Sequence, residues 1–384
     1  MDFSIEQNEL GLLCREIVAG REGGGCFDEG LWRELGKAGV LAAALPESAG
    51  GDGLGLLEQC SVLTEIGRAL APAPYLASIV LGASAITAFG TPEQQQRWAV
   101  PAGRAELVLT VALEPEDPRE SSASAERAGP GTGDAGAGNA GAGEAQAGGA
   151  ARMWRVSGVW TGVPAAPWAD LILVPAGDGV FVVERGAAGV TVEPQELTDG
   201  VTAGRVVLDG APAERLGGPE ASGTETSGQA AGVAAWLIER GTVGLCALQL
   251  GVTERALEMT AAYATSREQF GRPIGSFQAV AQRLADAWID VAAIRLTMWQ
   301  AAWRLSEALP TESGPADLAV STAKFWAADA GHRVAHTAVH VHGGVGIDVS
   351  HPLHRYFAAA THYEFSLGGA TAQLRHIGAE LARL

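Results

Sequence analysis

The sequence is poor in cysteine and in positive charge, and it lacks long uninterrupted apolar runs. Its 384 residues include four cysteines without Cys-x-x-Cys spacing, namely Cys14, Cys26, Cys60 and Cys246. That scatter disfavours zinc ligation and a disulfide framework, so no metal site is expected and buried free thiols in a reducing cytoplasm are predicted. No apolar run approaches the roughly 20 residues that span a bilayer, so membrane insertion is not expected.

The charge balance narrows the classes of partner. Lysine and arginine total 26 against 44 aspartates and glutamates, a formal charge of −18. This excess of acid argues against nucleic acid and anionic membrane as main partners. A phosphate-bearing ligand must therefore be bound by a few locally concentrated arginines. The opening MDFSIEQNELGLLCREIVAG lacks the basic and apolar regions of a signal peptide, so a cytoplasmic protein is expected.

What is present divides into three segments of different texture. Residues 1–105 carry apolar residues at helical spacing between glycine and proline breaks, which predicts a helical domain. Residues 106–216 are short β-branched runs separated by Gly, Pro and Asp, which predict a compact antiparallel β domain. Over 233–384, long helices with apolar residues around much of their circumference predict a helical bundle domain. The predicted fold class is α+β.

Two polar stretches interrupt this layout. The Ala-, Gly- and Ser-rich insert over 120–151 has almost nothing to bury, so it is predicted to be a disordered surface loop. The Gly-rich stretch 217–232 is expected to link the β domain to the bundle. With 47% hydrophobic residues, the remainder is sufficient for more than one buried core.

The stretch TSREQFGRPIGSFQ, residues 265–278, concentrates chemically distinctive side chains between two predicted helices. Arg267 offers a fork of donors that fits a pyrophosphate, and Phe270 can cover an adenine or a ribose. Pro273 cannot continue the preceding helix. The alternative is a helix–helix connection with solvated arginines. On the residues alone, the two interpretations are nearly even.

Three ordered stretches resemble signatures of the acyl-CoA dehydrogenase family. REQFGRPIGSFQAV, followed by RLAD, is similar to the flavin-binding signature of that family, and HVHGGVGIDVSHPLHRYF, residues 340–357, is similar to its second signature. LPESAGGDGLG with EIGRALAP matches a third, weaker pattern. The resemblance spans the chain. It implies an acyl-CoA dehydrogenase-like fold with an N-terminal helical domain, a central antiparallel β domain and a C-terminal four-helix-bundle domain.

The resemblance also implies a cofactor and a reaction. Such enzymes are usually tetramers that bind FAD between subunits, and they oxidise an acyl thioester of coenzyme A or a carrier protein across its α,β bond. Electrons then pass to an external acceptor. The residues carried over to the dinucleotide are Arg267, Phe270, Gln278, His340, Gly343 and Gly344. In the family they contact FAD seated mainly in a neighbouring subunit, and the glycines allow its close approach.

The resemblance places the catalytic glutamate at one of two positions, and neither holds a carboxylate in this sequence. For the first position, counting from the Thr-Ala-Gln run gives Gly369, and counting from the glycine signature gives Leu367. The second position, 26 residues before Arg267, is Gly241. Glu364 is the nearest carboxylate to the first position and is a weak candidate base, since an ordinary solvent-facing role is favoured.

The positions that would contact the flavin ring have changed as well. Leu113 occupies the place of a threonine, and Gly162 and Pro164 occupy those of a tryptophan and a threonine. Trp160 and Thr161 could substitute after a register shift, but Trp160 as part of the β-domain core is at least as well supported. The erosion is therefore selective: residues that reach a neighbour's cofactor are kept, and those for this chain's own reaction are not.

Three hypotheses follow from this pattern. The first is a base-lacking subunit of a mixed tetramer, which completes the FAD site of a homologous catalytic partner. The second is a self-sufficient homotetrameric dehydrogenase with an unconventional base. The third is a flavin-free structural or carrier-binding protein on the same fold. Four histidines near the end of the third long helix suggest metal binding by their spacing, but helix packing or solvent contact is the favoured interpretation, namely for His332, His336, His340 and His342.

Overall fold

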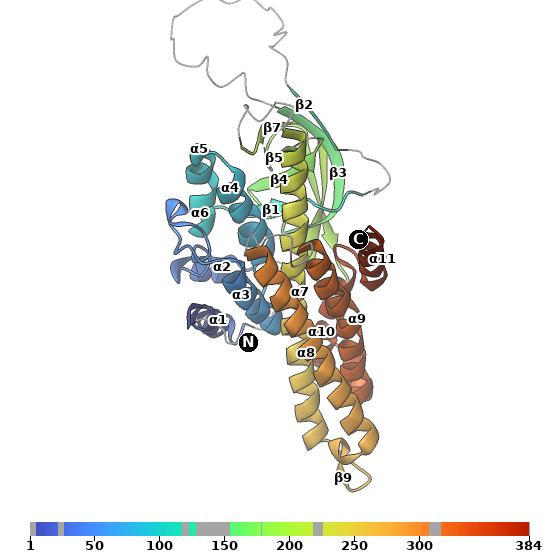
Figure 1. The fold of residues 1–384 in the computed structure, drawn as a ribbon. Coiled ribbons are helices and arrows are strands. Elements are labelled where there is room, and N and C mark those ends of the chain that lie inside the picture. The colour runs from blue at the N-terminus through green and yellow to red at the C-terminus, as the bar shows by residue number, and fades with distance from the viewer. Residues whose placement is uncertain are drawn as a thin grey trace, which may run out of the picture.

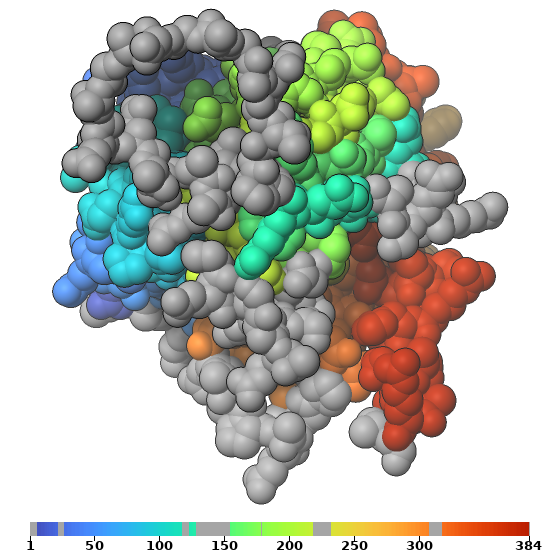
Figure 2. All heavy atoms as spheres, turned by 90° about the horizontal axis from the view of Figure 1, so that it is seen from above, coloured from blue at the N-terminus to red at the C-terminus, as the bar shows by residue number. Residues whose placement is uncertain are grey.

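The computed structural model describes residues 5–21, 27–116, 123–127, 154–177, 179–217, 226–306 and 316–383. Three domains follow one another in the predicted order, helical, β and helical (Figure 1). Viewed from above, the N-terminal helices and the C-terminal helix α11 lie on opposite sides of the strands (Figure 2). The three cysteines Cys14, Cys60 and Cys246 are buried, and Cys26 lies outside the described residues.

The N-terminal domain is built from short helices whose apolar faces meet in one core. Helix α2 illustrates the local cause: the Asp28 carboxylate accepts a hydrogen bond from the Leu31 amide at 2.9 Å, and Trp32 and Leu35 are buried on one face. The helices are α1 (Ile5–Val18), α2 (Glu29–Lys37), α3 (Leu56–Ala69), the π-helical segment Leu76–Ala83, α4 (Ser84–Phe89), α5 (Pro92–Gln94), the π-helical segment Gln95–Ala99 and α6 (Val100–Gly103).

The middle domain is a seven-stranded sheet with the order β1-β4-β5-β7-β3-β2, in which β6 also pairs with β7. The prediction of an antiparallel domain is wrong for one pair, because β1 and β4 run parallel. β1 enters from the last N-terminal helix and lies at the sheet edge, so its neighbour is reached only after a long connection. The strands are β1 (Leu109–Val111), β2 (Ser124–Arg127), β3 (Trp154–Pro164), β4 (Leu171–Ala176), β5 (Gly179–Glu184), β6 (Val190–Glu196) and β7 (Thr202–Arg215).

The two polar stretches differ in part from their predictions. Within the predicted insert, Ser124–Arg127 form β2 and pair with β3, so disorder is wrong for these residues. Residues 120–122 and 128–151 of the insert lie outside the described residues. The predicted linker is helical from Thr226, where α7 begins, and residues 218–225 lie outside the described part of the chain.

The C-terminal domain is organised around α7, which passes beside the sheet and continues the length of the bundle (Figure 1). Its helices are α7 (Thr226–Ser266), α8 (Gln278–Ser306), α9 (Ala316–His342), α10 (Leu353–Phe365) and α11 (Ala370–Leu381). The tip carries the two-residue strands β8 (Glu268–Gln269) and β9 (Arg272–Pro273). The buried amide of Gln249 joins three helices, since its Nε2 donates to the carbonyls of Ala327 and Ala360, both at 3.2 Å.

Helix α7 is apolar over most of its length. Over Gly232–Ser266 the helix is long enough to cross a bilayer, and the mean hydropathy of an 18-residue stretch within it reaches 1.2. However, 61% of that stretch is buried inside the protein. Burial against α3, α8, α9 and α10 accounts for this composition, because a helix packed on several sides needs apolar residues around its circumference.

Candidate active-site cavity and dinucleotide signature

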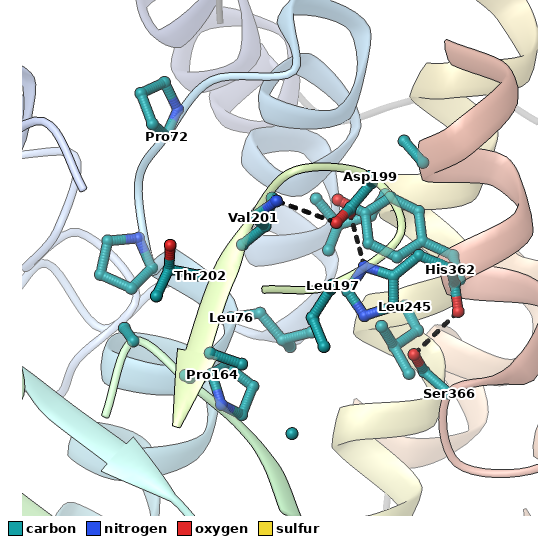
Figure 3. A pocket seen from close by; sticks show the side chains of 18 of the residues that line it. Pro72, Leu76, Pro164, Leu197, Asp199, Val201, Thr202, Leu245, His362 and Ser366 are labelled. Carbon is teal, nitrogen blue, oxygen red and sulfur yellow. Dashed lines mark hydrogen bonds and ion pairs between the residues drawn. The ribbon is translucent and has the colours of Figure 1, made fainter. Parts of the chain in front are cut away.

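A cavity of about 520 Å³ lies where the three domains meet. Its walls come from α3 and the segment after it, from the ends of β3 and β7, and from α7 and α10 (Figure 3). Most of the lining is apolar, with a few polar side chains at the wall. This size and composition are typical of a small-molecule site.

Two family base positions come together at one point of this wall. A Cβ placed on Gly241 would lie 3.2 Å from a methyl of Leu367, 3.6 Å from one of Leu81 and 3.7 Å from one of Leu113. Gly241 is on α7, and Leu367 is just after α10 in a left-handed conformation with φ 53°. The structure thus brings Leu367, rather than Gly369, beside Gly241. The spot is filled by leucine side chains.

Gly369 and Glu364 lie elsewhere. Gly369 precedes the first residue of α11, and its nearest neighbours are atoms of Glu364 and Phe365. The Glu364 carboxylate contacts the Nδ1 atom of His332 at 3.0 Å. Glu364 is not among the residues that line the cavity. The weak candidate base is therefore directed away from the cavity.

A different carboxylate lines the cavity, and sequence reasoning did not single it out. Glu114, in the exposed segment between β1 and the insert, accepts a hydrogen bond from the Leu367 amide at 3.2 Å. Its own carbonyl accepts from the Thr161 amide at 3.2 Å, which fixes this segment beside β3. Glu114 thus holds the turn that carries Leu367.

The flavin-ring positions also line the cavity, with the altered residues in place. Leu113, Gly162 and Pro164 all belong to its wall. Trp160 is 3% exposed and packs in the core of the β domain, as one of the two sequence interpretations expected. The Gly162 amide and the Thr161 hydroxyl both donate to Oε1 of Gln195, at 2.8 and 3.2 Å.

One partly buried Asp–His pair lines the cavity among the described residues. Asp199, in the hairpin loop between β6 and β7, contacts Nδ1 of His362 on α10 at 2.6 Å (Figure 3). The Asp199 side chain is 3% exposed and also accepts from the Val201 amide at 3.1 Å. Burial alone would raise the pKa of Asp199, but the hydrogen bond from His362 holds it below its usual value.

A buried lysine fixes the end of the helix that carries His362. Nζ of Lys324 on α9 donates to the carbonyls of Tyr363 at 2.5 Å and Glu364 at 3.1 Å. These are carbonyls of the last turn of α10, which the helix itself leaves unpaired. Burial lowers the pKa of Lys324. This lysine therefore sets where α10 ends and where the Leu367 turn begins.

The first signature forms the tip of the bundle, at the turn between α7 and α8. Arg267 and Gln278 are exposed, and within the described part of the chain the Arg267 side chain makes no ion pair. Phe270 is 94% exposed and has φ 55°, a conformation that costs a bulky residue energy. Arg272 stacks on Phe277 with its guanidinium carbon 4.2 Å from the ring centre. An exposed aromatic ring on a strained backbone is typical of a surface that meets another molecule.

The first part of the second signature, residues 340–344, lies at the same end of the bundle. His342, at the end of α9, stacks on Tyr263 of α7 with ring centres 4.3 Å apart. His340 is exposed, and no atom lies within 4 Å of a Cβ added to Gly343 or Gly344. Open space over these glycines fits the close approach of a dinucleotide to the backbone.

The first signature is far from the cavity in the same chain, whereas His354 and Arg355 at the end of the second signature line the cavity. Arg267 follows Gly241 by 26 residues, and at about 1.5 Å per residue this corresponds to about 39 Å along α7. An extended FAD molecule is shorter than this separation. One FAD therefore cannot contact the tip and place its ring in the cavity of the same chain.

Three of the four histidines whose spacing suggested metal binding contact neighbouring rings or backbone. His336 packs on Phe357 at 5.1 Å between ring centres and lies 4.2 Å from the ring of His332. Nδ1 of His342 contacts the Ala338 carbonyl at 2.9 Å. Among the described residues, a group that could hold a metal by distance alone lies on the surface, formed by Asp317, His376 and Glu380.

Comparison with known proteins is consistent with this architecture. Residues 13–106 match the acyl-CoA dehydrogenase N-terminal domain, and residues 230–382 match the acyl-CoA dehydrogenase C-terminal domain. The chain is 50% identical over 366 residues to the acyl-CoA dehydrogenase FadE27 of Mycobacterium tuberculosis, across 93% of this chain and 89% of that protein. The chain belongs to the acyl-CoA dehydrogenase family. This is a family of flavoprotein oxidoreductases with FAD as the cofactor.

Two solved structures are similar over nearly the whole length. A chain of the ChsE4-ChsE5 complex from Mycobacterium tuberculosis is 46% identical with a TM-score of 0.84, and the match covers 100% of both chains. A chain of the Tcur3481-Tcur3483 steroid ACAD is 36% identical with a TM-score of 0.82, over 98% of both chains. Each of these structures is named as a pair of different polypeptides.

Proposed function

We propose that this acyl-CoA dehydrogenase-family chain is the base-lacking subunit of a heteromeric complex. It completes the FAD site of a homologous catalytic subunit, and the complex oxidises an acyl thioester across its α,β bond. The observation that carries this proposal is the convergence of Gly241 and Leu367 on one apolar spot of the cavity. A base must lie within hydrogen-bond reach of the proton it removes, and neither residue can accept a proton.

The position of the signatures supports a role in a neighbour's site. The tip of the bundle lies about 39 Å along α7 from the cavity, by the helical rise of about 1.5 Å per residue. Arg267 can donate to phosphate oxygens in a fork, and Phe270 can cover the adenine or the ribose. Bound FAD supplies the acceptor for the β-hydrogen as hydride. This chain's residues would hold the dinucleotide end.

The comparisons support a mixed assembly and a bulky substrate. ChsE4-ChsE5 and Tcur3481-Tcur3483 both pair two different chains, and the second is named a steroid enzyme. We infer a homologous partner in a tetramer, a bulky acyl thioester as substrate, an external electron acceptor and a cytoplasmic location. The thiol carrier is coenzyme A or an acyl-carrier protein.

A self-sufficient enzyme is the second candidate, and one observation favours it. The Glu114 carboxylate bonds to the amide of Leu367, so a carboxylate of this chain lies beside one family base position. The Glu114 side chain is exposed, and its carboxylate is engaged by the backbone of the Leu367 turn. A carboxylate that acts as the base would instead have to face the substrate α-carbon.

Replacing Glu114 or Glu364 by glutamine separates the two candidates. Glutamine at position 114 keeps an oxygen that can accept from the Leu367 amide, so the turn is retained while the charge is removed. Because this chain supplies no base, we expect kcat of the complex with its partner to change by less than about twofold in either variant. Loss of a true general base would lower kcat by roughly 10² to 10⁴. Steady-state oxidation of an acyl thioester with an artificial electron acceptor measures this, and a drop of that size in either variant favours the self-sufficient enzyme.

A further inference from the structure

The Asp199–His362 pair is a polar contact in a mostly apolar cavity wall. A carboxylate that is 3% exposed is costly to bury unless it is paired, and this one is satisfied by the His362 ring and the Val201 amide. The two residues come from different domains, 163 positions apart in the chain. The pair therefore ties the β6–β7 hairpin to α10, and it also fixes the orientation of the histidine ring.

That orientation leaves one ring nitrogen for a ligand. Nδ1 of His362 is engaged by Asp199, and Nε2 makes no hydrogen bond to any residue that the structure describes. The ring belongs to the cavity wall, and the side chains of Leu76, Leu197 and Leu245 surround the same space (Figure 3). Nε2 of His362 is thus an unpaired polar atom at the wall of a mostly apolar cavity.

His362 is displaced from the position of the catalytic base in the family. His362 lies on α10 five residues before Leu367, which follows the end of that helix. Leu245 likewise lies about one turn beyond Gly241 on α7. His362 is therefore placed to meet a substituent of a ligand rather than its α-carbon.

We propose that the cavity of this chain is itself a binding site, which takes an alicyclic molecule that bears a hydroxyl group on Nε2 of His362. The inference rests on the proposed function, since a chain without its own flavin leaves the cavity to another ligand. A hydroxyl can donate to a neutral imidazole or accept from a protonated one, whereas a keto oxygen can only accept. The volume of about 520 Å³ accommodates fused rings.

Matched probes test this assignment on the full-length chain purified alone. The probes are 2-decalol and decalin, which share the same fused rings and differ by one hydroxyl, and isothermal titration gives their affinities. We expect 2-decalol to bind about tenfold more tightly than decalin, the value of one net hydrogen bond. His362→Leu should bring 2-decalol to the affinity of decalin and leave decalin unchanged. Asp199→Asn, which keeps an oxygen for the Val201 amide, should lose part of the difference.

The outcomes separate this inference from a purely structural role of the pair. Equal affinities of both probes for the unmodified chain, or no binding of either, overturn it. So does a His362→Leu chain that keeps the tenfold preference. A colourless chain that binds neither probe contradicts only this inference, whereas a chain that is yellow when purified alone contradicts the proposed function.

Discussion

Replacing Arg267 by alanine should lower the FAD affinity of the complex with the catalytic subunit by about a hundredfold. A guanidinium–phosphate hydrogen bond contributes about 1.5–3 kcal/mol, and about 2.7 kcal/mol corresponds to a hundredfold in affinity. Arg267 is exposed and unpaired within the described residues, so its removal leaves no buried partner unsatisfied and the fold should be unaffected. Titration of flavin-free complex with FAD, followed by flavin fluorescence, measures the change.

Arg33 provides the matched control. It is also an exposed arginine, on α2, where it pairs with Glu29 one turn away. Arg33→Ala should leave FAD affinity unchanged, since it lies in the N-terminal domain and away from the tip. If Arg267→Ala binds FAD as tightly as the unmodified complex, the assignment of the tip to the dinucleotide is wrong.

Replacing Gly251 by alanine should destabilise the protein by roughly 2–3 kcal/mol, the cost of overpacking a tight contact. A Cβ at Gly251 of α7 would lie 2.0 Å from the Thr64 carbonyl oxygen and 2.6 Å from the Arg68 amide nitrogen of α3. The contact is reciprocal, because a Cβ at Gly67 would lie 2.2 Å from the Leu248 carbonyl oxygen. Backbone atoms cannot rotate away, so the helices must separate. Urea unfolding followed by circular dichroism measures the loss.

The same substitution at Gly378 should have the opposite sign. Gly378 lies within α11, where no atom is within 4 Å of an added Cβ. Glycine loses more conformational freedom on folding than alanine does, so alanine at this position should stabilise the protein by roughly 0.5–1 kcal/mol. A Gly251→Ala protein as stable as Gly378→Ala would show that the α3–α7 crossing is not closely packed. Because α3 and α7 both form part of the cavity wall, Gly251→Ala should also weaken ligand binding in the cavity.

The order of domains could be predicted from sequence because each has its own apolar period. Helical spacing, short β-branched runs and long apolar helices are local patterns, and the structure has them in the predicted order. The misses concern pairing and boundaries. The parallel β1–β4 pair and the short β2 depend on contacts between distant segments, and the start of α7 at Thr226 lies in a Gly-rich stretch whose composition disfavours helix.

The candidate site divides in the same way. The dinucleotide signatures are contiguous, so their residues could be named from the chain alone. Two ways of counting gave Leu367 and Gly369 for one position, and only the fold places Leu367 beside Gly241. The Asp199–His362 pair joins two domains, and neither residue lies in a recognisable motif. Glu114 follows the altered position Leu113 in the sequence, and its bond to the Leu367 turn required the structure.

The flavin content of this chain, alone and with its partner, tests the central claim most directly. The chain would be purified by itself and again after co-expression with its homologous partner, and flavin released by denaturation would be measured per polypeptide. A chain that holds the dinucleotide end of another subunit's FAD but lacks a site of its own should be colourless alone. The complex should then carry half as many flavins as chains and oxidise an acyl thioester. A solitary chain with one flavin per polypeptide and full activity would contradict the account.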